Sequence, residues 1–211
     1  MWQDLSPVWQ TAFREMWASF CEGSTPVGAV LCDADGSILL SDRNRNQAPE
    51  TRNRRISHAE ANILRRLDTA AHDPRTLTLY TTMEPCPMCM GTALMSNLKR
   101  IHSAARDPYC GMAHLLETEP YYRRKNITLT FAGGEAEYFQ LTVQAYHELR
   151  YMEQGGGGDV FAAFARICPA AADAAKSLYA AKALDAAAAD GQDAGTVFDR
   201  ICRNPEAAHI R

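Results

Sequence analysis

Two short segments of the chain carry residues that could build a catalytic zinc site. The first, 57–60, reads SHAE, and the second, 84–89, reads EPCPMC. His58, Cys86 and Cys89 offer one imidazole and two thiolates, which leaves the fourth position of a tetrahedral zinc open for water, as a catalytic site requires. Zinc lowers the pKa of such a water toward neutrality. The two segments together therefore predict one bound zinc ion that activates water.

Glu60 follows the predicted ligand His58 by two residues. It is therefore close enough to lie beside the activated water without being a metal ligand. A carboxylate in that position can take a proton from the water and deliver it elsewhere. We predict that Glu60 is the general acid and base of the site.

The sequence around the two cysteines predicts how they are positioned. An apolar run at 77–80 reads as a strand, Pro85 and Pro87 bracket Cys86, and a helix is expected over 87–97. Cys86 and Cys89, three residues apart across a first helical turn, would point to the same side. The positive end of the helix dipole favours thiolates there.

Composition agrees with a soluble enzyme. The chain has 211 residues, 46% of them hydrophobic, which is enough for one good core. A net charge of −3 gives no general attraction to nucleic acid or to anionic membranes. Seven cysteines, without a signal-peptide pattern at the start, indicate a reducing cytoplasm and no disulfide framework. No apolar run is long enough to span a bilayer.

Helical and strand patterns alternate along most of the chain. A first helix carries apolar residues at helical spacing, two strands at 27–32 and 37–40 flank a hairpin turn, and a helix begins at His58. Strands at 76–82, 99–105 and 126–131 alternate with helices at 87–97, around 112–117 and at 135–153. This order predicts an α/β fold, a three-layer α/β/α sandwich with a mixed, mostly parallel five-stranded sheet.

The chain divides at a run of four glycines. We expect a zinc-dependent catalytic domain at 1–154, a glycine linker at 155–158 and an alanine-rich helical extension at 159–211. Phe161, Phe164, Ile167 and Cys168 form an apolar stripe at helical spacing in the extension. The extension has too few apolar residues for its own core, so packing on the catalytic domain or on a partner subunit is favoured over a lid.

The chain resembles the cytidine/deoxycytidylate deaminase superfamily, in particular the branch of tRNA-specific adenosine deaminase, guanine deaminase and fungal-type cytosine deaminase. The similarity runs from about Pro26 to about Tyr151, and its fixed points are 26–30 (PVGAV), 57–60, 84–89 and 105–107 (ARD). The resemblance implies a cytidine deaminase-like fold, one Zn²⁺ per subunit, and a homodimer. It also implies hydrolytic removal of an amino group from a heteroaromatic ring.

By the same resemblance, several residues are expected to contact the substrate. The backbone N–H of Ala59 and the carbonyl of Pro85 would hold the reacting group. Asn44 resembles the asparagine of the family that binds the base, although Asn46 competes for this role because the register of the loop is open.

The remaining expected contacts lie in two other fixed points of the resemblance. Val27 and Gly28 belong to the first of them. Asp107 would border the pocket, with a helix N-cap as its alternative role, since Pro108 follows it.

Three functions remain open from the sequence. The first is deamination of a free nucleobase or small nucleoside such as guanine or cytosine, and the second is deamination of adenosine in tRNA. The extension has about as many acids as bases, which disfavours a nucleic-acid partner and leaves phosphate binding to an arginine-rich loop at 43–55. A non-catalytic zinc-stabilised interaction module is the third, and Glu60 argues against it.

Overall fold

The computed structural model describes residues 1–203, in which five strands form one mixed sheet. The strand order is β2-β1-β3-β4-β5, with β1 antiparallel to both β2 and β3, and β3, β4 and β5 parallel. The strands are β1 (Gly28–Cys32), β2 (Ile38–Arg43), β3 (Thr78–Met83), β4 (Arg100–Ala105) and β5 (Thr128–Phe131). The predicted fold class is confirmed. Residues 204–211 of the predicted extension lie outside the described residues.

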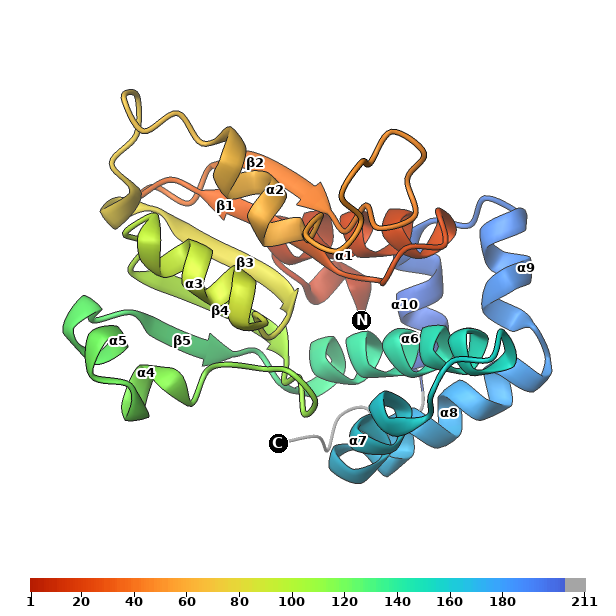
Figure 1. The fold of residues 1–211 in the computed structure, drawn as a ribbon. Coiled ribbons are helices and arrows are strands. Elements are labelled where there is room, and N and C mark those ends of the chain that lie inside the picture. Colours follow the sequence, from red (N-terminus) through yellow and green to blue (C-terminus); the bar gives the residue numbers. More distant parts are fainter. Residues whose placement is uncertain (204–211) are drawn as a thin grey trace.

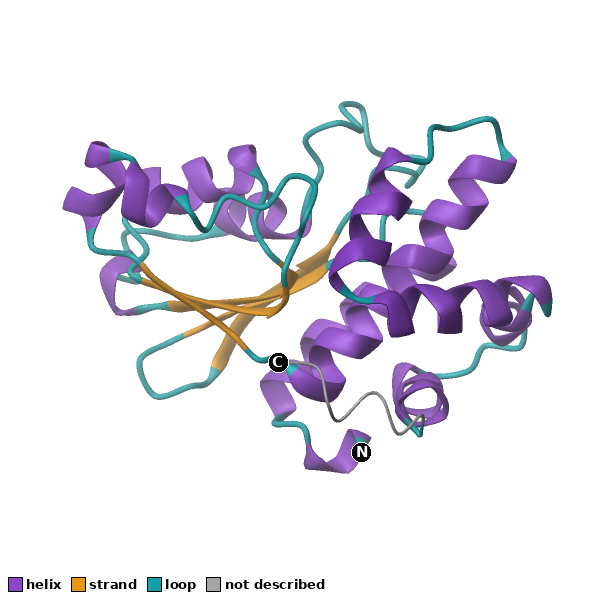
Figure 2. Ribbon diagram, turned by 90° about the horizontal axis from the view of Figure 1, so that it is seen from below, coloured by secondary structure: helices purple, strands orange, loops and turns teal. Residues whose placement is uncertain are grey.

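Helices cover both faces of this sheet (Figures 1 and 2). Successive side chains of a strand point to opposite faces. On β3, Tyr80 meets the ring of Trp9 in α1 (Pro7–Cys21), whereas Thr81 meets Glu60 in α2 (Ala59–Arg66). Helix α3 (Pro87–Met95) packs beside α2, and α6 (Gly134–Glu153) packs with α1. The metal-binding segments therefore lie on one face of the sheet, and α1 and α6 lie on the other.

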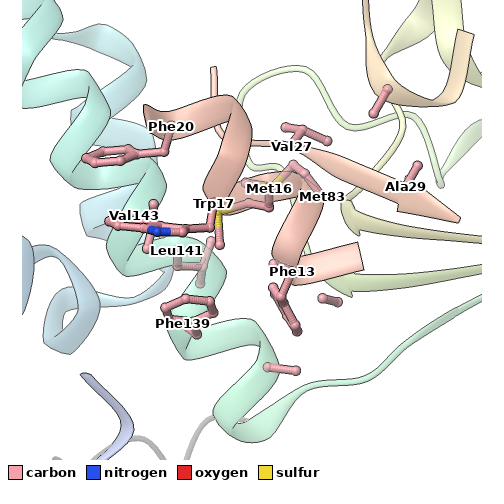
Figure 3. Packing of buried hydrophobic residues seen from close by; sticks show 14 of the residues in the cluster. Phe13, Met16, Trp17, Phe20, Val27, Ala29, Met83, Phe139, Leu141 and Val143 are labelled. Carbon is pink, nitrogen blue, oxygen red and sulfur yellow. The ribbon is translucent and has the colours of Figure 1, made fainter. Parts of the chain in front are cut away.

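The core between α1, α6 and the sheet is rich in aromatic side chains (Figure 3). Phe13, Met16 and Phe20 of α1 have no exposed surface, and the Phe13 and Phe139 rings are 5.2 Å apart. Ser6 caps α1 by accepting a hydrogen bond from the N–H of Trp9. The amphipathic pattern of α1 thus buries the apolar side of the helix against the sheet.

Shorter elements connect the main ones. They are η1 (Trp2–Asp4), η2 (Pro74–Thr76), α4 (Leu115–Thr118) and α5 (Pro120–Lys125). Helix α4 falls where a helix around 112–117 is predicted, but α5 is not predicted by the sequence pattern. Pro120 starts α5, and Glu119 accepts a hydrogen bond from the Tyr121 N–H, so local capping rather than apolar periodicity defines it.

Between the glycines and residue 203 the chain forms four helices: α7 (Asp159–Ile167), α8 (Pro169–Ala180), α9 (Ala183–Ala189) and α10 (Ala194–Cys202). They pack on α1 and α6: the Phe198 ring is 4.9 Å from that of Phe139, and Trp17 Nε1 donates to the Gln192 carbonyl at 2.7 Å. Ile167, which the stripe predicts to be buried, is 46% exposed. The division into domains stays a prediction.

A search of the described part of the chain for a helix both long and apolar enough to cross a membrane finds none.

Candidate metal centre and active site

The three predicted metal ligands meet at the N-termini of two neighbouring helices. His58 precedes the first residue of α2, Cys86 precedes the first residue of α3, and Cys89 lies in the first turn of α3. Their donor atoms lie within 4.8 Å of one another. The Nδ1 atom of His58 is 3.5 Å from the Sγ of Cys86 and 3.6 Å from that of Cys89.

This geometry fits a zinc ion. Tetrahedral zinc, with bonds of about 2.0–2.1 Å to nitrogen and about 2.3 Å to sulfur, separates these donor atoms by about 3.5–3.6 Å. One imidazole and two thiols are also the donors that zinc prefers. Within residues 1–203 three side chains converge, which leaves the fourth position of a tetrahedral ion for a reactant.

The two thiols differ in acidity. The pKa of Cys86 is lowered to about 4, chiefly because its thiolate accepts a hydrogen bond from the Cys89 thiol, with a further contribution from His58. The pKa of Cys89 is raised, because its proton is held by Cys86 and because the thiol is buried. The hydrogen bond with Cys86 raises the pKa of His58. A thiolate is thus already favoured at the N-terminus of α3.

Glu60 is buried directly beside these ligands. It is 3% exposed, and its two oxygens accept hydrogen bonds from Thr81 Oγ1 and from the Cys89 thiol, both at 3.3 Å. Burial raises the pKa of the Glu60 carboxyl. A carboxyl group beside the ligands, with its pKa raised in this way, is suited to exchange protons with a reactant.

A cavity of about 200 Å³ opens onto this group. Its lining combines residues from the metal-binding face with residues of α6 and α7, and no Lys or Arg is among the described residues that form it. Carboxylates line it instead. The residues are Thr25, Val27, Asn44, His58, Glu60, Met83, Glu84, Cys86, Asp107, Tyr109, Cys110, Gln144, Glu148, Val160 and Phe164. The cavity is therefore suited to an uncharged or cationic ligand.

Of the two candidate asparagines, Asn44 lines this cavity and Asn46 does not. The Oδ1 atom of Asn44 accepts the Ala59 N–H at 2.8 Å, which leaves Nδ2 as a donor for a ligand. The backbone N–H of Ala59 is therefore engaged by the protein itself. Asn46 is bound to Thr25 through both side-chain atoms, at 2.9 and 3.1 Å.

Two further predicted contacts, Pro85 and Gly28, are outside the lining. The Pro85 carbonyl accepts the Met112 N–H at 3.2 Å, although one carbonyl oxygen can accept a second hydrogen bond. Gly28 lies against α1, where a Cβ atom would stand 2.1 Å from the Ala12 carbonyl oxygen. Close packing of strand on helix thus explains the glycine, and its role as a substrate contact stays a prediction.

Val27 and Asp107 both line the cavity. Asp107 Oδ1 also accepts the backbone N–H groups of Tyr109 and Cys110, at 2.9 and 3.0 Å, so it has a turn-capping role as well. Its own N–H is held by Glu84, which also accepts the Ala113 N–H at 2.8 Å. Glu84 thereby attaches the loop after β4 to the metal-binding turn.

None of the arginines of the loop before His58 lines this cavity, although Arg54 and Arg55 line a separate pocket together with His58. Arg43 forms ion pairs with Glu15 and Glu22, and Arg45 with Asp42 and Glu50. Sequence reasoning did not identify the cavity residues of α6 and α7: Gln144, Glu148 and Val160 are in no motif, and Phe164 was assigned only to an apolar stripe. No local pattern marks which face of a helix turns toward a site.

The fold and site together define an α/β chain with an open His-Cys-Cys metal centre and a buried carboxylate. The family model of the cytidine and deoxycytidylate deaminase zinc-binding region matches residues 3–105. The tRNA-specific adenosine deaminase of Bacillus subtilis is 33% identical over 112 residues, which cover 50% of this chain and 67% of that enzyme. The chain belongs to the cytidine and deoxycytidylate deaminase family, whose members bind zinc.

Other relatives are named for different substrates or reactions. The cytosine deaminase of Candida albicans is 28% identical over 111 residues, 51% of this chain and 70% of that enzyme. For some relatives the chain spans as little as 15% of their length. A solved structure from work on A-to-I editing by tRNA:A34 deaminases has a TM-score of 0.48 and 22% identity, covering 59% of this chain and 96% of the other.

Proposed function

We propose that the protein is a zinc-dependent hydrolytic deaminase that removes the exocyclic amino group of a free nucleobase or small nucleoside and releases ammonia. The observation that carries the proposal is the cavity of about 200 Å³ in which Glu60 lies beside His58 and Cys86. Membership of a zinc-binding deaminase family supports the reaction. The dimensions and charge of the cavity support the substrate class.

The proposed mechanism assigns a task to each group of the chain. His58, Cys86 and Cys89 would hold a zinc ion, which would supply an activated water as the nucleophile at neutral pH. Glu60 takes a proton from this water and passes it to a ring nitrogen; once the oxygen is bonded to the ring carbon, Glu60 takes the remaining proton of that oxygen and passes it to the departing amine. The ring keeps the oxygen of the water and the amine leaves as ammonia. Asn44 Nδ2 donates to an acceptor on the ring.

Two features favour a small, unphosphorylated substrate. Pockets for drug-sized ligands are about 300–1,000 Å³, so a cavity of about 200 Å³ suits a single heterocycle better than a nucleotide. A phosphate would also meet the carboxylates of Asp107 and Glu148 with no Lys or Arg in the described lining to neutralise it. We therefore propose bases and nucleosides ahead of nucleotides.

The test is ammonia release by the zinc-loaded protein from a panel of free bases, the matching nucleosides, and a tRNA anticodon stem-loop. Turnover of at least one base or nucleoside, abolished in Glu60→Gln with bound zinc retained, is the expected result. If the protein binds zinc stoichiometrically but releases ammonia from no base or nucleoside, the proposed function is wrong.

Deamination of adenosine in tRNA is the second candidate, because the Bacillus subtilis relative bears that name. In the same assay, this function requires turnover of the stem-loop and no turnover of free bases. Against it stand Val160 and Phe164 of α7, which line the cavity from a helix beyond the matched region. A non-catalytic zinc-stabilised module is disfavoured, because it has no use for Glu60. We further propose a cytoplasmic homodimer with a small-molecule substrate.

A further inference from the structure

Glu148 is a buried carboxylate in the cavity to which the deamination chemistry gives no task. It lies on α6, is 8% exposed, and has no ion-pair partner among residues 1–203. Gln144, one helical turn earlier, donates to Glu148 Oε1 at 2.8 Å, and no second partner from the described chain reaches Oε2. Burial raises the pKa of this carboxyl group. Because Glu148 lines the cavity, its Oε2 atom is available to accept a hydrogen bond from a ligand there.

The location of Glu148 indicates which part of a substrate it meets. His58 and Glu60 enter the cavity from helices on one face of the sheet, whereas Glu148 enters from α6 on the other. Glu148 and Thr25 also line a neighbouring polar cavity of about 330 Å³. Glu148 therefore lies at the border between the two cavities, where a substituent on the ring would extend out of the first one. Phe164, 3% exposed, closes the same wall from α7.

Free bases and nucleosides differ in their chemistry at one atom. In a free base, one ring nitrogen bears a hydrogen, and in the nucleoside that nitrogen carries the sugar instead. A carboxylate facing this nitrogen accepts the N–H of the base. With a nucleoside the carboxylate would be buried without a partner, and the sugar would have to displace it.

We propose that Glu148 is a specificity-determining residue that accepts a hydrogen bond from this ring N–H and so selects free nucleobases over nucleosides. This inference rests on the proposed function and narrows its substrate class to the free base. A site built around a substrate N–H rejects analogues that lack it by about 10⁴–10⁵-fold. Wild-type protein is therefore expected to prefer a base to its nucleoside by about that factor.

The test compares each turned-over base with the same base methylated at that nitrogen and with its nucleoside, using wild type, Glu148→Gln and Glu148→Ala. For the free base, kcat/KM should fall by about 10- to 100-fold in Glu148→Ala, the value of a hydrogen bond to a charged group. The loss should appear mainly in KM, because this bond is made with substrate and transition state alike. The preference for base over methylated base should shrink by at least about 100-fold, since the unpaired carboxylate is gone.

Glu135→Gln is the matched control, because Glu135 lies on the same helix but outside the cavity, where it pairs with the N-terminus. It should leave the base preference unchanged. Zinc content and Tm are measured for every variant, and Glu148→Gln serves if the alanine variant is unstable. An unchanged base preference in both Glu148 variants would overturn the inference, and so would wild-type turnover of nucleosides equal to that of bases. In either case the proposed deaminase function would stand, whereas turnover of no base or nucleoside would remove both.

Discussion

Replacing Phe198 by alanine is expected to destabilise the whole chain, although this residue lies near the end of the extension. Phe198 has no exposed surface, and its ring is 4.9 Å from Phe139, 6.0 Å from Phe13 and 5.7 Å from Trp2. Buried Phe→Ala substitutions cost about 3–5 kcal/mol. The aromatic contacts with three different elements place this one near the middle or upper part of that range, at about 4 kcal/mol.

The assay is reversible unfolding of the zinc-loaded protein, by denaturant and by heat. For a chain of this length, about 4 kcal/mol corresponds to a decrease in Tm of roughly 8–16 °C. Ile167→Ala is the control within the same extension, because Ile167 is 46% exposed and its replacement should change stability by less than about 0.5 kcal/mol. If Phe198→Ala lost under 1 kcal/mol, or melted the extension while the rest unfolded at the wild-type temperature, the inference of one shared core would be refuted.

Three further predictions concern the site and its surroundings. Glu60→Gln should retain stoichiometric zinc, measured by elemental analysis, yet lower kcat by about 10²–10⁴-fold, and a fully active variant would contradict its proton-transfer role. Cys86→Ala should lose both zinc and activity, whereas wild-type protein stripped by a chelator should recover both on addition of zinc; recovery without metal would disprove the dependence. His147 has a pKa lowered to about 4, mainly by burial and also by Arg150, so below its ordinary pKa of 6.5 the unfolded chain takes up a proton that the folded chain does not. The free energy of unfolding contributed by neutral His147 should therefore be constant above pH 6.5 and fall by up to about 3 kcal/mol toward pH 4. The measurement is the difference in unfolding free energy between wild type and His147→Gln as a function of pH. A difference that does not vary with pH would contradict this reasoning.

The metal ligands could be predicted from the sequence because their spacing is local. Cys86 and Cys89 share one helical turn, and a proline-marked strand-to-helix connection fixes where that turn begins. The α/β class could be predicted for a similar reason, because the apolar periodicity of a helix or of a strand can be recognised in each segment by itself. The structure brings His58 to the two cysteines across the α2–α3 pair.

The substrate-facing residues could not be predicted in the same way. Asn44 and Asn46 are the same residue type two positions apart in one loop, and only the fold separates them: Asn44 lines the cavity and accepts the Ala59 N–H, whereas Asn46 is bound to Thr25. Gln144 and Glu148 belong to a helix that is buried on nearly all sides, so periodicity does not reveal which residues face a cavity. Phe164 reads as part of an ordinary apolar stripe until the fold places α7 against the site.

The region that the family model matches and the residues that line the cavity do not coincide. The family model ends at residue 105, so it includes His58, Glu60 and both cysteine ligands but not the wall formed by α6 and α7. The residues to which we assign the reaction thus lie inside the matched region, whereas relatives that match this chain are named for different substrates. In the proposed function, contacts to the rest of the ring come both from Asn44, inside the matched region, and from the wall of α6 and α7, which the model does not match. The name of a relative is therefore weak support for a substrate here, and Glu148 and Phe164 are the positions at which to test it.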